Sequence, residues 1–170
     1  MINIVLFAPE IPNNTGNIMR TAMASNTRLH LVKPLGFELS DKQLKRSGLD
    51  YLKDTNYTIY DSFTDFEAKN PGKYFLISRY GKATYSDANF ACEEDVYLIF
   101  GNESSGLSKE ILKKYKDSAL RIPMVENARS LNLANTVALV LYESLRQTGF
   151  KNLSLKEAIK GEDFIDQVTK

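Results

Sequence analysis

Short apolar runs alternate along this chain with segments in which apolar side chains recur every three or four residues. The apolar runs, rich in β-branched and aromatic residues, predict strands at Ile2–Phe7, Leu29–Val32, Tyr57–Tyr60, Tyr74–Ser78, Val96–Phe100 and Ala119–Ile122. The segments of helical period predict helices at Thr15–Ser25, Asp41–Leu52, Ser62–Lys69, Ser108–Tyr115 and Leu133–Thr148. This alternation is typical of an α/β domain with a mostly parallel sheet flanked by helices.

The length of 170 residues fits one domain. We expect residues 1–150 to form it and residues 151–170 to form a C-terminal tail, which could hold one short helix. Asn13 and Asn14 are the expected N-cap candidates of the first helix, and Ser130 or Asn132 is the expected cap of the last.

The last predicted helix is apolar on nearly all sides, which distinguishes it from the others. Its apolar residues, with those just before it, are Leu131, Leu133, Ala134, Val137, Ala138, Leu139, Val140, Leu141, Tyr142 and Leu145. Such a helix must be covered all round, and a domain of this size covers one side with its own sheet. We therefore expect the other side to meet a second copy of the chain in a homodimer; burial within one monomer is the alternative.

The amino-terminal segment MINIVLFAPEIPNN has no basic lead-in, and no apolar stretch reaches the roughly 18–20 residues of a membrane span. We expect a cytoplasmic protein without a membrane anchor. Cys92 is the only cysteine, which excludes an internal disulfide and a multi-cysteine zinc site. His30 has no companion at metal-ligand spacing, so we expect no metal and a structural histidine.

The formal net charge is only +1, but the basic residues are unevenly distributed. No acidic residue occurs between Ile11 and Phe37. The basic residues there and in two later groups are Arg20, Arg28 and Lys33, then Lys42, Lys45, Arg46 and Lys53, then Lys109, Lys113, Lys114, Lys116 and Arg121. Such local charge can hold a phosphate backbone, with ordinary solvated surface as the alternative.

Three polar loops follow predicted strands, where open α/β sheets place their ligands. The first, PEIPNNTGNIMR, contains the flexible Gly16 and ends at Arg20, which we expect in the first turns of the helix. A guanidinium there can donate paired hydrogen bonds to phosphate or ribose oxygens, with a surface salt bridge as the alternative.

The second loop, GNESSGLS, is a near miss to the phosphate-binding P-loop. Leu107 stands where the P-loop has lysine, and Glu103 puts a carboxylate where phosphate oxygens would lie. Both changes disfavour a nucleoside triphosphate. The loop better suits a cation such as S-adenosylmethionine, because its glycines allow close backbone approach and Glu103 favours positive charge. The third loop, IPMVENARSLNLAN, brings Ser130, Asn132 and Asn135 to the head of the apolar helix.

In this order the loops resemble the three motifs of the SPOUT methyltransferases, in the TrmH-like branch that methylates RNA ribose 2′-oxygens. NNTGNIMRTA resembles the first motif, IFGNESSGL the second and RIPMVENARSLNLANTVALVLYE the third. The stretches NIVLFAPEIPNNTGNIMR and KPLGFELSDKQLKRSGLDYL are most similar to the tRNA wobble-position enzymes of that branch. The resemblance covers about residues 1–149, and it departs at Ser105, where relatives often have arginine.

The resemblance implies a SPOUT fold with a C-terminal trefoil knot, S-adenosylmethionine as cofactor and an active site completed in a homodimer. The residues it implies nearest the chemistry are Arg20, Glu103 and Asn132. Those implied at the cofactor are Ile77, Ser78, Phe100, Gly101, Glu103, Ile122, Met124, Ser130 and Leu131. The RNA contacts expected from the basic residues are Arg20, Lys42, Lys45 and Arg46.

The implied activity is 2′-O-methylation of the wobble nucleotide, cytidine or uridine 34, of tRNA. Alternatives are a methyltransferase acting on ribosomal RNA and a non-catalytic RNA-binding module. A nucleotide phosphotransferase is disfavoured by Leu107 and Glu103. Arg20 would orient the ribose or accept its proton.

Overall fold

The computed structural model describes residues 1–38 and 56–167, and in them one parallel sheet runs in the order β3-β2-β1-β6-β4-β7-β5. The strands are β1 (Ile2–Phe7), β2 (Arg28–Val32), β3 (Tyr57–Tyr60), β4 (Lys73–Ile77), β5 (Ala83–Thr84), β6 (Val96–Phe100) and β7 (Ala119–Arg121). The helices are α1 (Pro12–Ala24), α3 (Phe63–Lys69), α4 (Lys109–Lys114) and α5 (Leu133–Gln147), with single turns η1 (Tyr85–Asp87) and η2 (Lys116–Ser118). The α/β class with a mostly parallel sheet is confirmed.

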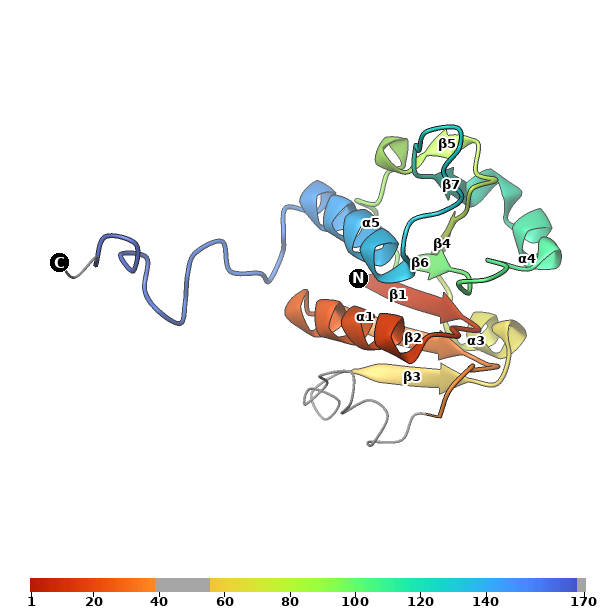
Figure 1. Cartoon of the computed structure of the whole chain (residues 1–170), viewed down its shortest axis with the longest axis horizontal. Coiled ribbons are helices and arrows are strands. Elements are labelled where there is room, and N and C mark those ends of the chain that lie inside the picture. Colours follow the sequence, from red (N-terminus) through yellow and green to blue (C-terminus); the bar gives the residue numbers. More distant parts are fainter. Residues whose placement is uncertain (39–55, 168–170) are drawn as a thin grey trace.

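Helices cover both faces of the sheet (Figure 1). On one face α1 and α5 lie side by side and bury Ile18, Met19 and Val137 against Ile4 and other residues of β1 and β6. On the other face α3 and α4 pack over a second apolar cluster, which includes Val5, Phe66, Ile99 and Ile111. The central strands are thus buried on both sides, which explains why they read as continuous apolar runs.

All six predicted strands match the structure to within a residue, but β5 has only two residues and was missed. Helix α1 begins at Pro12, three residues earlier than predicted, with Ile11 at the N-cap and no side-chain cap. The prediction that Asn13 or Asn14 caps this helix is therefore wrong, since the ring of Pro12 suits the first helical position. The predicted helix Asp41–Leu52 lies outside the described residues.

Helix α5 begins as predicted, because Asn132 caps it by accepting hydrogen bonds from the backbone N–H groups of Ala134 (2.9 Å) and Asn135 (3.3 Å). Its side chains Val137, Val140, Leu141 and Leu145 are buried in the same chain. Leu139 and Tyr142 remain 38% and 45% exposed. One side of the helix is therefore covered within the chain, and an apolar strip on the other side is not.

The tail extends away from the body of the molecule (Figure 1). Its described part, residues 151–167, contains turns and bends, so the short helix expected there is not formed. Leu155 and Ile159 are 79% and 93% exposed, and an isolated helix of this length is marginal without packing. Among the described residues, no helix has the length and apolar character needed to cross a membrane.

Candidate active site

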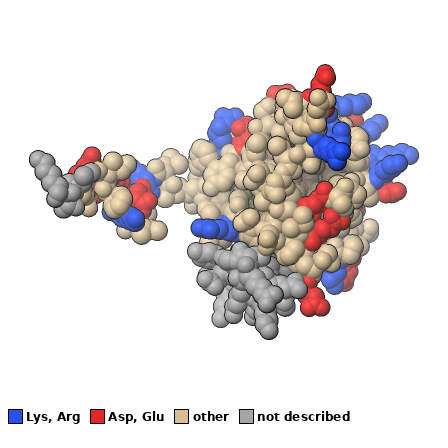
Figure 2. Space-filling model, viewed as in Figure 1, with Lys and Arg blue, Asp and Glu red and all other residues tan. Residues whose placement is uncertain are grey.

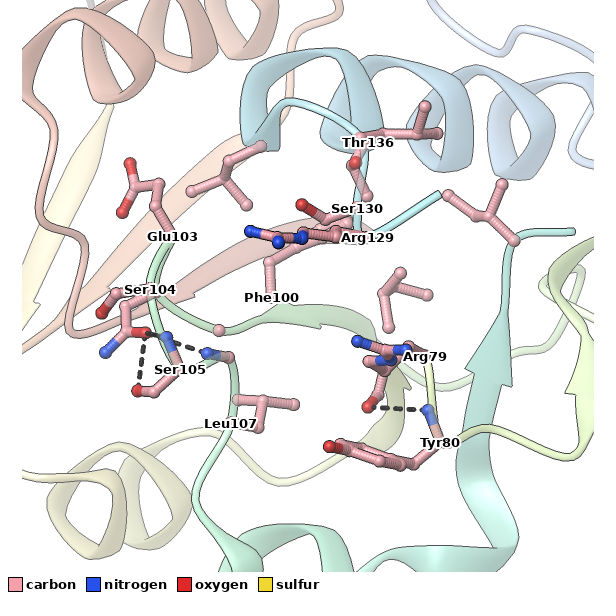
Figure 3. A pocket seen from close by; sticks show the side chains of 18 of the residues that line it. Arg79, Tyr80, Phe100, Glu103, Ser104, Ser105, Leu107, Arg129, Ser130 and Thr136 are labelled. Carbon is pink, nitrogen blue, oxygen red and sulfur yellow. Dashed lines mark hydrogen bonds between the residues drawn. The ribbon is translucent and has the colours of Figure 1, made fainter. Parts of the chain in front are cut away.

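A pocket of about 570 Å³ opens at the carboxyl ends of β4, β6 and β7 (Figure 3). Its lining comes from residues 77–80 and 100–107, and from residues 122, 124 and 129–131 of the loop after β7. Leu112 of α4 and the first turns of α5 complete it. Small-molecule sites occupy roughly 300–1,000 Å³ and favour this edge of an open parallel sheet. The volume and position fit a cofactor-sized ligand.

Every residue predicted at the cofactor lines this pocket. They are Ile77, Ser78, Phe100, Gly101, Glu103, Ile122, Met124, Ser130 and Leu131. They are separated by up to 54 positions in the chain, and the parallel topology brings them together. Their binding of a cofactor stays a prediction, but their placement around one cavity is observed.

The loop after β6 is closed by its own backbone. A Cβ atom at Gly101 would lie 2.1 Å from the carbonyl carbon of Gly106, so the missing side chain makes room for the loop itself. The side-chain oxygen of Asn102 accepts hydrogen bonds from the N–H groups of Ser105 (2.7 Å) and Gly106 (2.9 Å). Gly106 has φ +73°, which favours glycine. These contacts fix one wall of the pocket.

Glu103 binds the loop that follows β1. Its carboxylate accepts hydrogen bonds from the N–H groups of Glu10 (2.9 Å) and Ile11 (3.3 Å) and from the side-chain amide of Asn14 (2.9 Å). In return, the carboxylate of Glu10 accepts hydrogen bonds from the N–H (3.1 Å) and hydroxyl (2.7 Å) of Ser104. Glu103 therefore holds two pocket loops together, a role that its sequence position did not reveal.

Asn14 extends this connection to the third loop. Its side-chain oxygen accepts a hydrogen bond of 3.0 Å from Asn132, while its amide donates to Glu103. Two residues predicted nearest the chemistry, Glu103 and Asn132, are thus joined through a buried asparagine that had been interpreted as a helix cap. The helix was predicted to begin at Thr15, so Asn14 was placed just before it and this connecting role was not predicted.

Arg20 does not line the pocket of its own chain. Because α1 begins at Pro12, Arg20 lies in the third turn of the helix, and the expectation of a place in the first turns is wrong. It lies on the exposed side of α1 with Asn13 and Asn17. The other predicted RNA contacts, Lys42, Lys45 and Arg46, lie outside the described residues.

The pocket residues that the sequence interpretation missed include three large side chains, Arg79, Tyr80 and Arg129 (Figure 3). Arg79 and Tyr80 follow β4 directly, so the rule that ligands bind beyond the carboxyl ends of parallel strands could have identified them. The turn after β4 is a fourth loop at this edge of the sheet, beside the three polar loops predicted from the sequence.

His30 lies in the core, away from this pocket. Its ring nitrogens lie 2.9 Å from the hydroxyl of Tyr60 and 3.4 Å from the side-chain oxygen of Asn3. Burial lowers the pKa of His30 to about 4, helped by the nearby charge of Arg28. The histidine is structural, as expected. In the described parts of the chain, no three His, Cys, Asp or Glu side chains are grouped to hold a metal ion.

Basic side chains gather on the side of the molecule that carries α4 and β5 (Figure 2). The group predicted from the sequence contributes Lys109, Lys113 and Lys114 to α4. Lys114 forms an ion pair of 2.6 Å with Glu67. This side borders the pocket, because Leu112 of α4 is part of the pocket lining.

The fold and the pocket together define an α/β protein whose ligand site is formed by interlocked loops at the carboxyl edge of a parallel sheet. Residues 1–142 match the sequence profile of the SpoU rRNA Methylase family. The chain belongs to the SpoU methylase family. This result confirms the family resemblance inferred from the three motifs.

A relative from Escherichia coli (strain K12), named tRNA (cytidine(34)-2′-O)-methyltransferase, is 42% identical over 159 residues, covering 92% of this chain and 100% of the relative. A solved structure from work on the 2-OH methylation of C/U34 on tRNA superposes with a TM-score of 0.81 at 44% identity, covering 88% and 97%. The SpoU methyltransferase AviRb from Streptomyces viridochromogenes, in complex with AdoMet, gives a TM-score of 0.74 at 27% identity, covering 86% of this chain and 60% of that one.

Proposed function

We propose that this chain transfers a methyl group from S-adenosylmethionine to the ribose 2′-oxygen of the wobble nucleotide, cytidine or uridine 34, of tRNA. The observation that carries the proposal is the pocket, which gathers every residue the family motifs place at the cofactor. The relative and the solved structure that concern nucleotide 34 support the choice of substrate.

The lining of the pocket fits S-adenosylmethionine. Phe100, Ile122 and Met124 offer apolar walls for an adenine ring. Arg129 and Ser130 project into the cavity (Figure 3) and suit a carboxylate and hydroxyl groups. When bound, the cofactor supplies a methyl group on a positively charged sulfur, which is already activated toward a nucleophile.

The residues of the chain contribute mainly alignment. The contacts of Glu103, Asn14 and Asn132 fix the pocket loops, so that the ribose can be held in line with the methyl group at about 3–3.5 Å. Arg20 orients the ribose and an adjacent phosphate and stabilises the negative charge that develops at the 2′-oxygen as the hydroxyl proton passes to water. A guanidinium group is a poor base, so we assign Arg20 an orienting role.

We further propose a homodimer in which Arg20 serves the pocket of the partner subunit. Arg20 is absent from the pocket lining of its own chain and lies on the outer side of α1. Beside α1, helix α5 presents the exposed side chains of Leu139 and Tyr142. Pairing these faces would cover the apolar strip and give Arg20 a route to a second pocket.

We also propose the C-terminal trefoil knot that the family resemblance implies. β6 lies between β1 and β4, and β7 lies between β4 and β5. We propose that α5 is threaded through the chain that connects β4 to β7. When the chain is unfolded by pulling on both ends, its end-to-end length should stay below the roughly 3.3–3.6 Å per residue of an unknotted chain. Full extension would contradict the knot.

The proposed substrate implies the cytoplasm as the compartment, and Lys42, Lys45 and Arg46 as contacts to tRNA phosphates.

The direct test of the proposed function is methylation of a transcribed RNA pool with labelled cofactor, followed by mapping of the 2′-O-methyl sites. We expect the label at nucleotide 34 of tRNA. A label in ribosomal RNA alone, or none, would contradict the proposal.

A further inference from the structure

Tyr80 is a large aromatic residue at the rim of the pocket whose ring packs into neither core cluster. It is 72% exposed, although it belongs to the pocket lining. Figure 3 shows it on the opposite side of the cavity from Glu103 and Ser104. An exposed aromatic ring at the mouth of a site is a candidate contact for a ligand larger than the pocket.

The turn that carries Tyr80 is held firmly. The N–H of Tyr80 donates to the hydroxyl of Ser78 (3.2 Å), and the N–H of Gly81 donates to the carbonyl of Ser78 (3.1 Å). A Cβ atom at Gly81 would lie 2.3 Å from the carbonyl carbon of Leu120, so this turn packs directly on β7. Arg121 anchors it further by donating to the carbonyl oxygen of the residue before Tyr80 (2.8 Å). The exposed ring is therefore presented in a defined place.

Arg79 stands beside the ring, with its guanidinium carbon 5.9 Å from the centroid of Tyr80. An aromatic ring next to a guanidinium is a common arrangement for single-stranded RNA, because the ring stacks on a base and the cation meets a phosphate. Phe100, Ile122 and Met124 already offer apolar walls for a cofactor deeper in the cavity. Most of the Tyr80 surface remains available for RNA.

We infer that Tyr80 stacks on a nucleobase next to the target ribose, and that Arg79 contacts a neighbouring phosphate. The inference rests on the proposed function and adds two RNA contacts, on the turn after β4, to those predicted on α1 and at residues 42–46. Stacking on a π-face tolerates any base, so the contact would position the loop without selecting its sequence.

The test compares Tyr80→Ala with Tyr80→Phe, which keeps the ring. Binding of an anticodon stem-loop should weaken about tenfold in Tyr80→Ala and remain at the wild-type level in Tyr80→Phe. The affinity for S-adenosylmethionine, measured by calorimetry, should be the same in all three proteins. In Arg79→Gln, the slope of log affinity against log salt should become shallower by about 0.7, the contribution of one single-strand phosphate.

A spectroscopic signal separates stacking from a general loss of affinity. With 2-aminopurine placed beside the target nucleotide and saturating protein, fluorescence should be quenched by the wild type and Tyr80→Phe and restored in Tyr80→Ala. Weaker cofactor binding in Tyr80→Ala with unchanged RNA binding would overturn the inference, as would unchanged RNA binding and quenching. Failure of the wild type to methylate tRNA would instead contradict the proposed function.

Discussion

At the scale of single residues, Asn14 connects the three loops that form the pocket. It donates to Glu103 and accepts from Asn132, and it is buried. Asn14→Ala should lower the free energy of unfolding by about 1–3 kcal/mol, because a charged acceptor and an amide donor each lose a partner. Methyl transfer should fall as well, because the loops lose their alignment.

Asn17→Ala is the matched control for stability, since Asn17 is exposed on the same helix. Urea denaturation of both variants gives the comparison. Equal stability of Asn14→Ala and Asn17→Ala would show that the connection contributes nothing to the fold.

His30 gives the stability of the protein a pH dependence. Its pKa is about 4 in the folded state, while the pKa of an exposed histidine is about 6.5. The unfolded chain therefore binds the proton more readily. Between these values the free energy of unfolding should fall as the pH falls, by up to about 1.4 kcal/mol per pH unit. His30→Gln, which keeps a polar side chain that does not titrate, should lose this slope. Denaturation of both proteins at pH 7 and pH 5 measures how the free energy of unfolding changes with pH. An equal change in the wild type and in His30→Gln would refute the prediction.

At the scale of elements, α5 is predicted to join two copies of the chain. Leu139→Asp and Tyr142→Asp would each place an unpaired charge in the proposed interface, which should dissociate or unfold the dimer. Ile159→Asp is the control, because Ile159 is 93% exposed in the tail, away from this face. Sedimentation of the three variants and the wild type is the measurement. A monomeric wild type at micromolar concentration with full activity would rule out this interface.

The pattern of apolar residues was sufficient to predict the strands and helices that form the core. The strands β1 and β6 are apolar runs, and the start of α5 was predicted beside Asn132, one of the two expected cap residues. Elements set by tertiary context were harder: β5 has only two residues, and α1 begins at a proline without any side-chain cap. Local patterns do not contain that information.

In the candidate site, too, some residues could be predicted from the sequence and others could not. The cofactor residues could be predicted because the family motifs fix their positions, and the fold then brings them to one cavity. The contacts of Glu103 and Asn14 could not, because they join residues 89 positions apart. Arg79 and Tyr80 were missed because their turn matches no motif, although it follows a predicted strand.

At the scale of the whole molecule, the proposed assignment of Arg20 to the partner's pocket can be tested with mixed dimers. One chain carries Arg20→Ala and the other Ser130→Arg, which should block the pocket. Each homodimer should be inactive. If Arg20 acts across the interface, the mixed dimer has one intact pocket facing one intact arginine, and it should recover about half of the wild-type activity.

Recovery of activity by purified mixed dimers, with unchanged cofactor affinity in the Arg20→Ala homodimer, is the expected result. If Arg20 served its own pocket, neither site of the mixed dimer would be complete. The mixed dimer would then be as inactive as its parents, which would exclude action across the interface.

The central claim is that the pocket directs methyl transfer to the wobble ribose of tRNA. Labelled methyl incorporation should be compared in an anticodon stem-loop, the same stem-loop with a 2′-deoxy nucleotide at position 34, and fragments of ribosomal RNA. We expect incorporation into the first substrate alone, since the deoxy sugar lacks the accepting oxygen. Methylation that survives the deoxy substitution, or that favours ribosomal RNA, would contradict it.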